Sequence, residues 1–89
     1  MLHVAVRGRV QGVGFRWFAR ERARALGLTG WVRNRDDGSV EVLAVGDAPS
    51  LREFRQLLAT GPSGAKVSAV EDQQGEPATA PMNPFGVLR

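Results

Sequence analysis

The chain contains no cysteine and no tyrosine, and only one histidine and one lysine among its 89 residues. Without cysteine it can form neither a disulfide framework nor a thiolate metal site, and it has no thiol nucleophile. A lone histidine excludes a histidine metal cluster. No apolar run approaches the roughly 20 residues of a membrane span, and the N-terminus lacks a signal-peptide pattern. We therefore expect a cytoplasmic protein with a small hydrophobic core.

The scarcity of groups that titrate at alkaline pH also explains the sequence pI of about 11.0, because the net charge is only +3. The pI is thus no sign of nucleic-acid binding. The distribution of charge is more informative. Residues 1–35 hold eight arginines and one glutamate, whereas residues 36–89 hold four basic and eight acidic residues. We expect the N-terminal part to attract small anions, and to do so less as salt concentration rises.

The spacing of apolar residues predicts the order βαββαβ with a short additional strand. Strands are predicted over residues 2–7, 29–35, 40–45, 66–74 and 85–88, and helices over residues 16–26 and from Ser50 to Gly61. This order is typical of a ferredoxin-like split βαβ sandwich, an α+β fold with two helices on one face of a four-stranded antiparallel sheet. The last strand would be a short fifth. We expect one domain over residues 1–89.

Local signals support several of these boundaries. Ser-Leu-Arg-Glu at residues 50–53 has the pattern of a capping box for the second helix, which Gly61-Pro62 would end. Asp-Asp-Gly-Ser at residues 36–39 predicts the turn of a hairpin between the second and third strands. Val67 and Val70 break strict alternation, so the register of the fourth strand stays open.

A glycine-rich segment, Gly-Arg-Val-Gln-Gly-Val-Gly-Phe-Arg at residues 8–16, leads from the first strand into the first helix. Its three glycines allow successive backbone N–H groups to face a ligand. A helix N-terminus is already partly positive, so Arg16 is unfavourable there unless an anion lies between. The segment predicts a phosphate site of amides and one guanidinium, although such turns also occur without a ligand.

The segment differs from well-known phosphate loops. A P-loop would end in Gly-Lys-Ser/Thr, and a dinucleotide-binding loop would need a small residue at the position of Trp17. A thiolate-based phosphatase loop would need cysteine. If phosphoryl chemistry occurs here, we expect the nucleophile to be water or a group of the substrate.

Asn34 is a second candidate. A right-handed crossover makes the first and second strands parallel, so their C-terminal ends lie at the same edge of the sheet. The glycine-rich segment leaves the first strand there, and Asn34 lies near the end of the second. Its carboxamide either caps the adjacent turn or holds a water beside a phosphate.

Residues 8–16 and the stretch Gly-Trp-Val-Arg-Asn at residues 30–34 together resemble the two signature stretches of the acylphosphatase family. Residues 37–42 are similar to the hairpin of that family, Gly61-Pro62 to the end of its second helix, and residues 85–88 to its closing strand. The resemblance covers nearly the whole chain, and residues 73–84 match least.

The resemblance implies a ferredoxin-like fold and the hydrolysis of the carboxyl–phosphate bond of acyl phosphates, with no metal or other cofactor. Asn34 would position the attacking water, and Arg16 would bind the phosphate together with loop amides. The loop residues that would contribute backbone N–H groups are Gln11, Gly12, Val13, Gly14, Phe15 and Arg16. Expected partners are a small acyl phosphate and competing phosphate or sulfate, with neither nucleic acid nor membrane. We expect a monomer.

Three other functions compete. An RNA-binding module shares this strand order but displays aromatic residues on its central strands, and the first and third strands here have none. A regulatory module could use the same site as an anion sensor. The chain also resembles the acylphosphatase-like domain of a larger maturation enzyme, although its end at Arg89 favours a stand-alone enzyme.

The remaining notable residues have structural interpretations. We expect His3 to pack or form a hydrogen bond on the first strand, and Glu71-Asp72 to form a solvated strand face. Aromatic residues are expected to be buried or half-buried, and several arginines to be ordinary surface charges. This expectation concerns four of the six aromatic residues, Trp17, Trp31, Phe54 and Phe85, and the four arginines Arg7, Arg9, Arg33 and Arg35.

Overall fold

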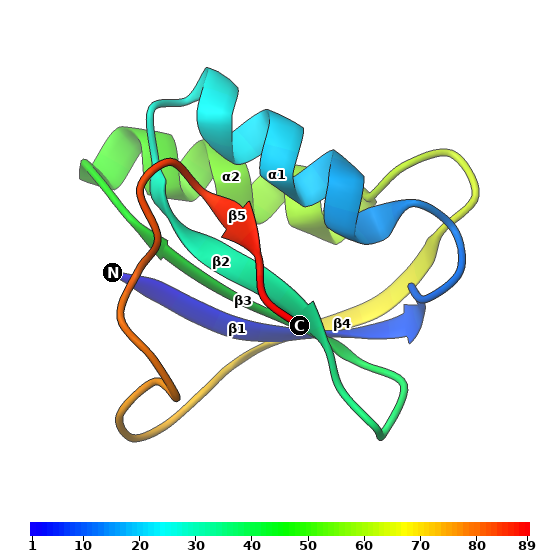
Figure 1. The fold of residues 1–89 in the computed structure, drawn as a ribbon. Helices are drawn as coiled ribbons and strands as arrows, with labels where there is room; N and C mark the ends of the chain where they lie inside the picture. Colours follow the sequence, from blue (N-terminus) through cyan, green and yellow to red (C-terminus); the bar gives the residue numbers. More distant parts are fainter.

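The computed structural model of the protein describes residues 1–89 as one sheet with two helices packed on one face (Figure 1). The chain forms β1 (Leu2–Arg9), α1 (Phe15–Ala25), β2 (Thr29–Asn34), β3 (Val40–Val45), α2 (Ala48–Thr60), β4 (Lys66–Asp72) and β5 (Gly86–Val87). The predicted order of elements and the α+β ferredoxin-like class are confirmed. No helix is both long and apolar enough to cross a membrane.

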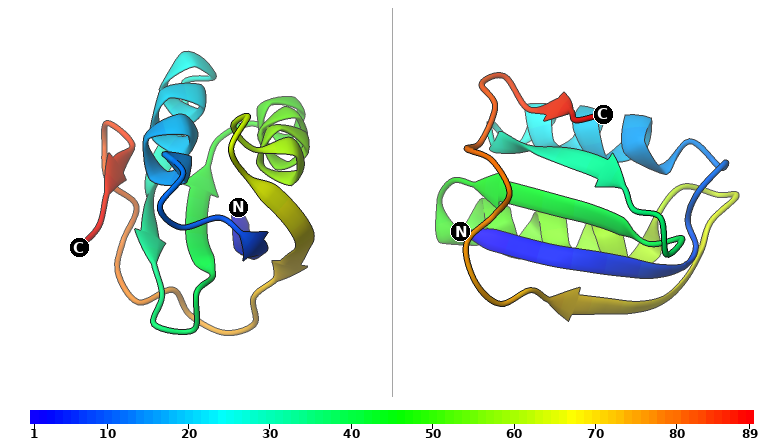
Figure 2. Two further views of the ribbon diagram at one scale, coloured as in Figure 1. Left: turned by 90° about the vertical axis from the view of Figure 1, so that its right-hand side faces the viewer. Right: turned by 60° about the horizontal axis from the view of Figure 1, so that its bottom comes forward.

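The strand order is β4-β1-β3-β2-β5, so β3 lies between β1 and β2 as the crossover rule predicts. The pairs of the four main strands are antiparallel, whereas β5 pairs in parallel with β2. The sheet is therefore mixed. Residues 73–84 lead from the end of β4 across the helix-free face to the start of β2 (Figure 2). Because they reach β2 at its first residues, β5 must run in the same direction as β2.

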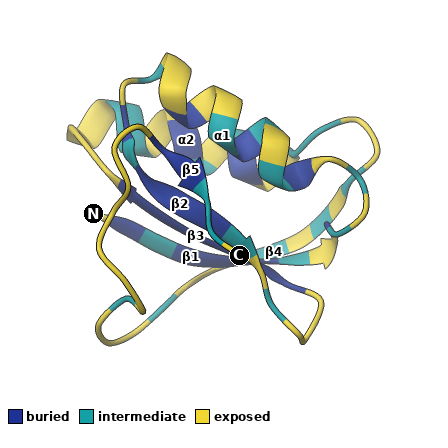
Figure 3. Ribbon diagram, in the orientation of Figure 1, coloured by how far each residue is buried: buried dark blue, intermediate teal, exposed yellow.

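The hydrophobic core lies between the helices and the sheet (Figure 3). Phe54 of α2 and Phe85 stack edge to face there, with ring centroids 5.9 Å apart. The α1 side contributes small residues, Ala19 and Ala23, which allow the helix to approach the sheet closely. Burial of each large apolar side chain stabilises the fold by about 1.5–3 kcal/mol. The core therefore holds both ends of α1, and with them the glycine-rich loop, against the sheet.

Two predicted strand ends need correction by two residues each. β1 extends to Arg9, beyond the predicted end at residue 7, and β4 ends at Asp72 instead of residue 74. The last two residues of β1 pair with β4: Gly8 lies opposite Val67, and Arg9 lies opposite Lys66. This pairing shifts register at the Arg7/Gly8 step. The shift explains why Val67 and Val70, out of strict alternation, both pack against the core.

The predicted capping box of the second helix is wrong. The helix begins at Ala48 with Asp47 as its N-cap, and Ser50 lies inside the first turn. Pro49 explains the earlier start, because its fixed φ suits the first turn of a helix and its missing N–H needs no partner there. The predicted end is confirmed, since Gly61 is the C-cap.

Residues 73–84 cross the helix-free face of the sheet and cover the part of it around Trp31. Gly30 and Met82 exchange two backbone hydrogen bonds, and the indole N–H of Trp31 donates to the carbonyl of Thr79 at 3.2 Å. Trp31 is consequently fully buried. The part of this face around Trp31, which the strand pattern leaves open, is thus closed by a segment with little regular structure.

A buried ion-pair cluster lies on this covered face. Glu41 is only 2% exposed, and its two carboxylate oxygens contact His3 Nε2 at 2.6 Å and Arg33 Nε at 2.6 Å. Arg35 Nε donates to the same carboxylate at 3.2 Å. The hydrogen-bonding role expected for His3 is confirmed. The expectation that Arg33 and Arg35 are ordinary surface charges is wrong, because they neutralise a buried carboxylate.

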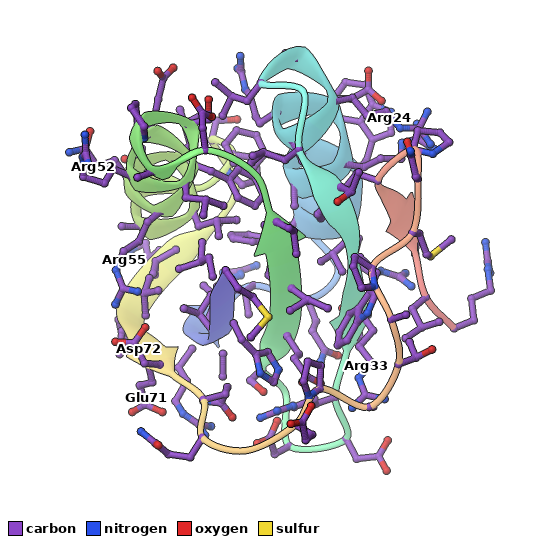
Figure 4. All side chains as sticks on the ribbon, turned by 90° about the vertical axis from the view of Figure 1, so that its left-hand side faces the viewer. Arg24, Arg33, Arg52, Arg55, Glu71 and Asp72 are labelled. Atoms are coloured by element: carbon purple, nitrogen blue, oxygen red, sulfur yellow. The ribbon has the colours of Figure 1, made fainter.

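Other exposed charges follow the expectation of a solvated surface. Glu71 pairs with Arg7, and Asp72 pairs with Arg55 of α2 at 2.7 Å. Arg55 and Asp72 lie next to each other at the β4 edge, and Arg33 lies on the far side of the sheet beside the covering segment (Figure 4). Strands β1 and β3 therefore lie between the Arg55–Asp72 pair and Arg33.

Candidate functional site

A cavity of about 310 Å³ opens where α1 begins, at the sheet edge formed by the C-terminal ends of β1 and β2. Its wall consists of Val10, Gly12, Gly14, Phe15, Arg16, Trp17, Arg20, Asn34, Val87 and Arg89. The two candidates singled out in the sequence, Arg16 and Asn34, thus line one cavity although 18 positions separate them. The parallel crossover from β1 to β2 brings them together.

The glycine-rich loop forms the floor of this cavity. Gly12 and Gly14 adopt positive φ angles of 75° and 79°, a conformation that side-chain-bearing residues rarely adopt. Gly14 is the N-cap of α1, and no side chain caps the helix. None of the backbone N–H groups of residues 11–17 donates a hydrogen bond to another protein group. The loop and the first helical turn therefore present a continuous set of free donors.

Arg16 lies within the first turn of α1, where no acidic residue accompanies it. Its guanidinium forms neither an ion pair nor a hydrogen bond in the protein. A cation beside the positive end of a helix dipole is unfavourable by about 0.3–1 kcal/mol. An anion between the guanidinium and the free amides would reverse the sign of this interaction.

Asn34 is exposed and its carboxamide has no hydrogen-bond partner in the protein. The interpretation of Asn34 as the cap of the adjacent turn is therefore wrong. Asp37 performs that role, since its carboxylate accepts from the Ser39 hydroxyl at 2.6 Å and from the Ser39 backbone N–H at 2.9 Å. These two hydrogen bonds lower the pKa of Asp37 from 3.8 to about 2. The turn is capped independently of Asn34, whose amide stays free to bind another group.

The charged residues around the cavity have one sign. Arg16, Arg20 and Arg89 line it, and no aspartate or glutamate side chain does. Arg20 forms an ion pair with the adjacent Glu21, with 3.1 Å between Arg20 Nε and Glu21 Oε2. No group of three histidine, aspartate or glutamate side chains that could hold a metal ion is found in the protein. The cavity is thus built to accept a small, strongly negative group.

Four of the six predicted loop residues line the cavity: Gly12, Gly14, Phe15 and Arg16. Val13 instead packs against the hydrophobic core. Gln11 directs its side chain to the β2–β3 turn, where it donates to the Arg35 and Ser39 carbonyls. The loop therefore has residues that face the cavity and residues that anchor it.

Sequence reasoning missed part of the cavity wall. Trp17, expected to be buried or half-buried, is 62% exposed and lines the cavity, so that expectation is wrong. Arg20 could have been found, because it lies one helical turn after Arg16 on the same face of α1. Val87 and Arg89 reach the cavity only because β5 pairs with β2, and no local pattern indicates this.

The strand order, the two helices on one face and the cavity at the start of α1 define a ferredoxin-like α+β domain. Comparison with known proteins gives its family. The acylphosphatase family model matches residues 2–85. The chain is 51% identical over 70 residues to an acylphosphatase of Nitrobacter hamburgensis, covering 79% of this chain and 71% of that one. It is 53% identical to an acylphosphatase of Pseudomonas aeruginosa, covering 82% and 80% of the two chains.

Solved structures agree with this result. The crystal structure of acylphosphatase from Bacillus subtilis superimposes with a TM-score of 0.81 at 38% identity, and each chain is covered completely. HypF from T. kodakarensis also contains a similar domain, with a TM-score of 0.78 at 30% identity, but the match covers only 11% of its length. The chain belongs to the acylphosphatase family.

Proposed function

We propose that the protein is an acylphosphatase, a hydrolase that converts an acyl phosphate and water into a carboxylate and orthophosphate. The observation that carries the proposal is the meeting of Arg16, Asn34 and the free backbone N–H groups of Gly12 and residues 14–17 at one cavity with no acidic wall residue. A phosphoryl group matches this arrangement in charge and in its number of acceptor oxygens. The names of the relatives support the same reaction.

In the proposed mechanism the phosphoryl group binds to the loop amides and to the guanidinium of Arg16. Asn34 holds a water on the opposite side of the phosphorus atom from the leaving carboxylate. The water attacks phosphorus in line, the bond between phosphorus and the carboxyl oxygen breaks, and a phosphoryl oxygen of the substrate accepts the proton of the water. The contributions of the protein are positioning and electrostatic stabilisation of the developing charge.

The leaving group explains why few catalytic groups are needed. A carboxylate leaves without protonation, so no general acid is required. The only histidine, His3, is paired with Glu41 on the helix-free face and does not line the cavity. Because the cavity wall also has no carboxylate, we expect neither a protein general base nor a divalent cation to take part.

The proposal extends to ligands and setting. Free phosphate or sulfate should bind the same amides as the substrate and compete with it, less effectively at high ionic strength. We propose a monomeric protein that acts in the cytoplasm on a small-molecule substrate and binds neither nucleic acid nor membranes. The absence of cysteine is compatible with a reducing compartment.

Hydrolysis of benzoyl phosphate in the presence of excess EDTA tests the proposal directly. We expect full activity after exhaustive chelation. When the reaction runs in oxygen-18 water, the label should enter phosphate and be absent from benzoate, because water attacks phosphorus. Label in the carboxylate, or a phosphoenzyme trapped by acid quenching, would contradict the mechanism. No hydrolysis at all would contradict the function.

A further inference from the structure

The side chain of Gln11 connects the two halves of the candidate site. Gln11 lies in the glycine-rich loop, and its Nε2 donates to the backbone carbonyl of Arg35 at 2.8 Å and to that of Ser39 at 3.0 Å. Both carbonyls belong to the turn between β2 and β3, and Arg35 directly follows Asn34 in the sequence. One carboxamide therefore joins the proposed phosphate-binding loop to the backbone that carries Asn34.

At this junction the Arg35 and Ser39 carbonyls each accept two hydrogen bonds. Within the turn, Arg35 N donates to the Ser39 carbonyl at 2.9 Å, and Gly38 N donates to the Arg35 carbonyl at 3.2 Å. Each carbonyl oxygen has two lone pairs, and the turn uses one of each. The two N–H groups of the Gln11 amide donate to the remaining lone pair of each carbonyl, one to Arg35 and one to Ser39. Gln11 thus holds both carbonyls of the turn in one fixed arrangement.

Few other polar contacts link the loop to the β2–β3 turn that follows Asn34. The β1–β3 ladder ends at the pair Val6↔Val40, and the last residues of β1 pair with β4 alone. Apart from Gln11, the turn is linked to this part of the chain by an ion pair between Arg7 of β1 and Asp37. The two charged groups lie 3.3 Å apart and are largely exposed to solvent. Exposed pairs contribute little rigidity or stability. Since the Asn34 carboxamide has no partner of its own, its place depends on its backbone.

We propose that Gln11 is a positioning residue for the hydrolytic reaction: its side chain fixes the distance between the phosphate on the loop and the water held by Asn34. This inference rests on the proposed function and adds to it a residue whose side chain touches neither reacting group. An error of about 1 Å in such a distance can cost on the order of 100-fold in rate. Loss of one of several constraints should cost less, about 10-fold in kcat.

A double-mutant cycle with Asn34 tests the inference. Gln11→Leu keeps a side chain of similar size and removes both donors, so kcat should fall about 10-fold while the phosphate inhibition constant stays within about 2-fold. In the Asn34→Ala background the same substitution should change kcat less than about 2-fold, because the group that it positions is gone. Gln73→Leu is the matched control, since Gln73 bonds the Arg35 guanidinium and not its carbonyl. Its kcat should equal that of the wild type.

A purely structural role would give a different pattern. In that case Gln11→Leu would lower kcat equally in both backgrounds, and this additivity would overturn the inference. A loss of phosphate affinity would overturn it as well, because Gln11 would then act through the phosphate. The free energy of unfolding of all four proteins of the cycle should be measured to show that they are folded.

The side-chain amide signals of Asn34 in NMR spectra of the phosphate-bound protein give a readout without turnover. Gln11→Leu should shift and broaden these signals, and Gln73→Leu should leave them unchanged. Unchanged Asn34 signals in Gln11→Leu would overturn the inference. A wild-type protein that hydrolyses no acyl phosphate would contradict the proposed function, and the NMR result would still decide the role of Gln11.

Discussion

Arg16 at the cavity and the arginines of the helix-free face have opposite surroundings. On the helix-free face, Arg33 and Arg35 both contact the buried Glu41, at 2.6 Å and 3.2 Å. At the cavity, Arg16 has no carboxylate partner, although it belongs to the same arginine-rich N-terminal part of the chain. The same residue type is thus neutralised in one region and left unbalanced in the other.

This difference indicates that the charges of the helix-free face contribute to stability, whereas the charge at the cavity contributes to function. A buried carboxylate that is hydrogen-bonded on both oxygens stabilises the fold as long as its partners remain, and breaking such a cluster costs several kcal/mol. An unpaired guanidinium beside a helix N-terminus contributes nothing favourable until an anion binds. We therefore expect substitutions at the cavity to affect activity with little effect on stability, and substitutions on the helix-free face to do the reverse.

The largest effect on activity is expected for Arg16→Ala. Loss of the guanidinium should raise KM and lower kcat, reducing kcat/KM for benzoyl phosphate by on the order of 1,000-fold. The free energy of unfolding should stay the same or rise slightly, because an unfavourable charge leaves the start of α1. Steady-state kinetics and urea denaturation measure the two quantities.

Arg22→Ala is the matched control for this variant. Arg22 lies on α1 as well, is exposed and does not line the cavity, so its removal changes the net charge equally. Its kcat/KM should remain within about 3-fold of the wild type, the size expected for a general electrostatic effect. Similar losses in the two variants would mean that net charge, and not the place of Arg16, matters.

Asn34→Ala should have the second-largest effect. Turnover should fall by on the order of 100-fold, as for the loss of one preorganised polar group, while the affinity for phosphate stays nearly intact. The inhibition constant of phosphate against benzoyl phosphate measures that affinity. Phosphate affinity that falls as far as in Arg16→Ala would contradict the separate roles of the two residues.

The fold and the centre of the site could be predicted from the sequence because they follow from local and periodic signals. The apolar alternation of β1 and β3 and the apolar face of α2 set the core, and the glycines at positions 12 and 14 mark a loop with free amides. The crossover rule then places Asn34 near that loop without any knowledge of side chains. These inferences depend on the backbone, which sequence patterns describe well.

The remaining features depend on long-range packing. Glu41 alternates with apolar residues of β3 and would lie on a solvated face if residues 73–84 did not cover it. The path of this segment is set by contacts with Gly30 and Trp31, which have no periodic signature. For the same reason the burial of Arg33 and Arg35 against Glu41 could not be predicted. The anchoring role of Gln11 likewise needs the geometry of two carbonyls from a distant turn.

The smallest effect on activity, and a clear effect on stability, is expected for Glu41→Gln. Burial alone would raise the pKa of Glu41, but hydrogen bonds from His3, Arg35 and Arg33 outweigh it and lower the pKa from 4.5 to about 2. A carboxyl group whose pKa is lowered by folding stabilises the folded state above its unfolded pKa. This contribution, about 3 kcal/mol, is lost as the pH falls from about 4.5 to about 2.

Glu41→Gln should therefore be less stable than the wild type by at least this amount at pH 7, with kcat within about 3-fold for the fraction that is folded. The difference in unfolding free energy should shrink as the pH falls below 4.5, because the wild type then loses the same negative charge. Glu71→Gln is the matched control: Glu71 contacts Arg7 at the same 2.6 Å but is exposed, so solvent screens the pair. Urea denaturation from pH 7 to pH 2.5 compares the three proteins. A stability difference that does not change with pH, or equal losses in the two variants, would contradict the role assigned to the buried cluster.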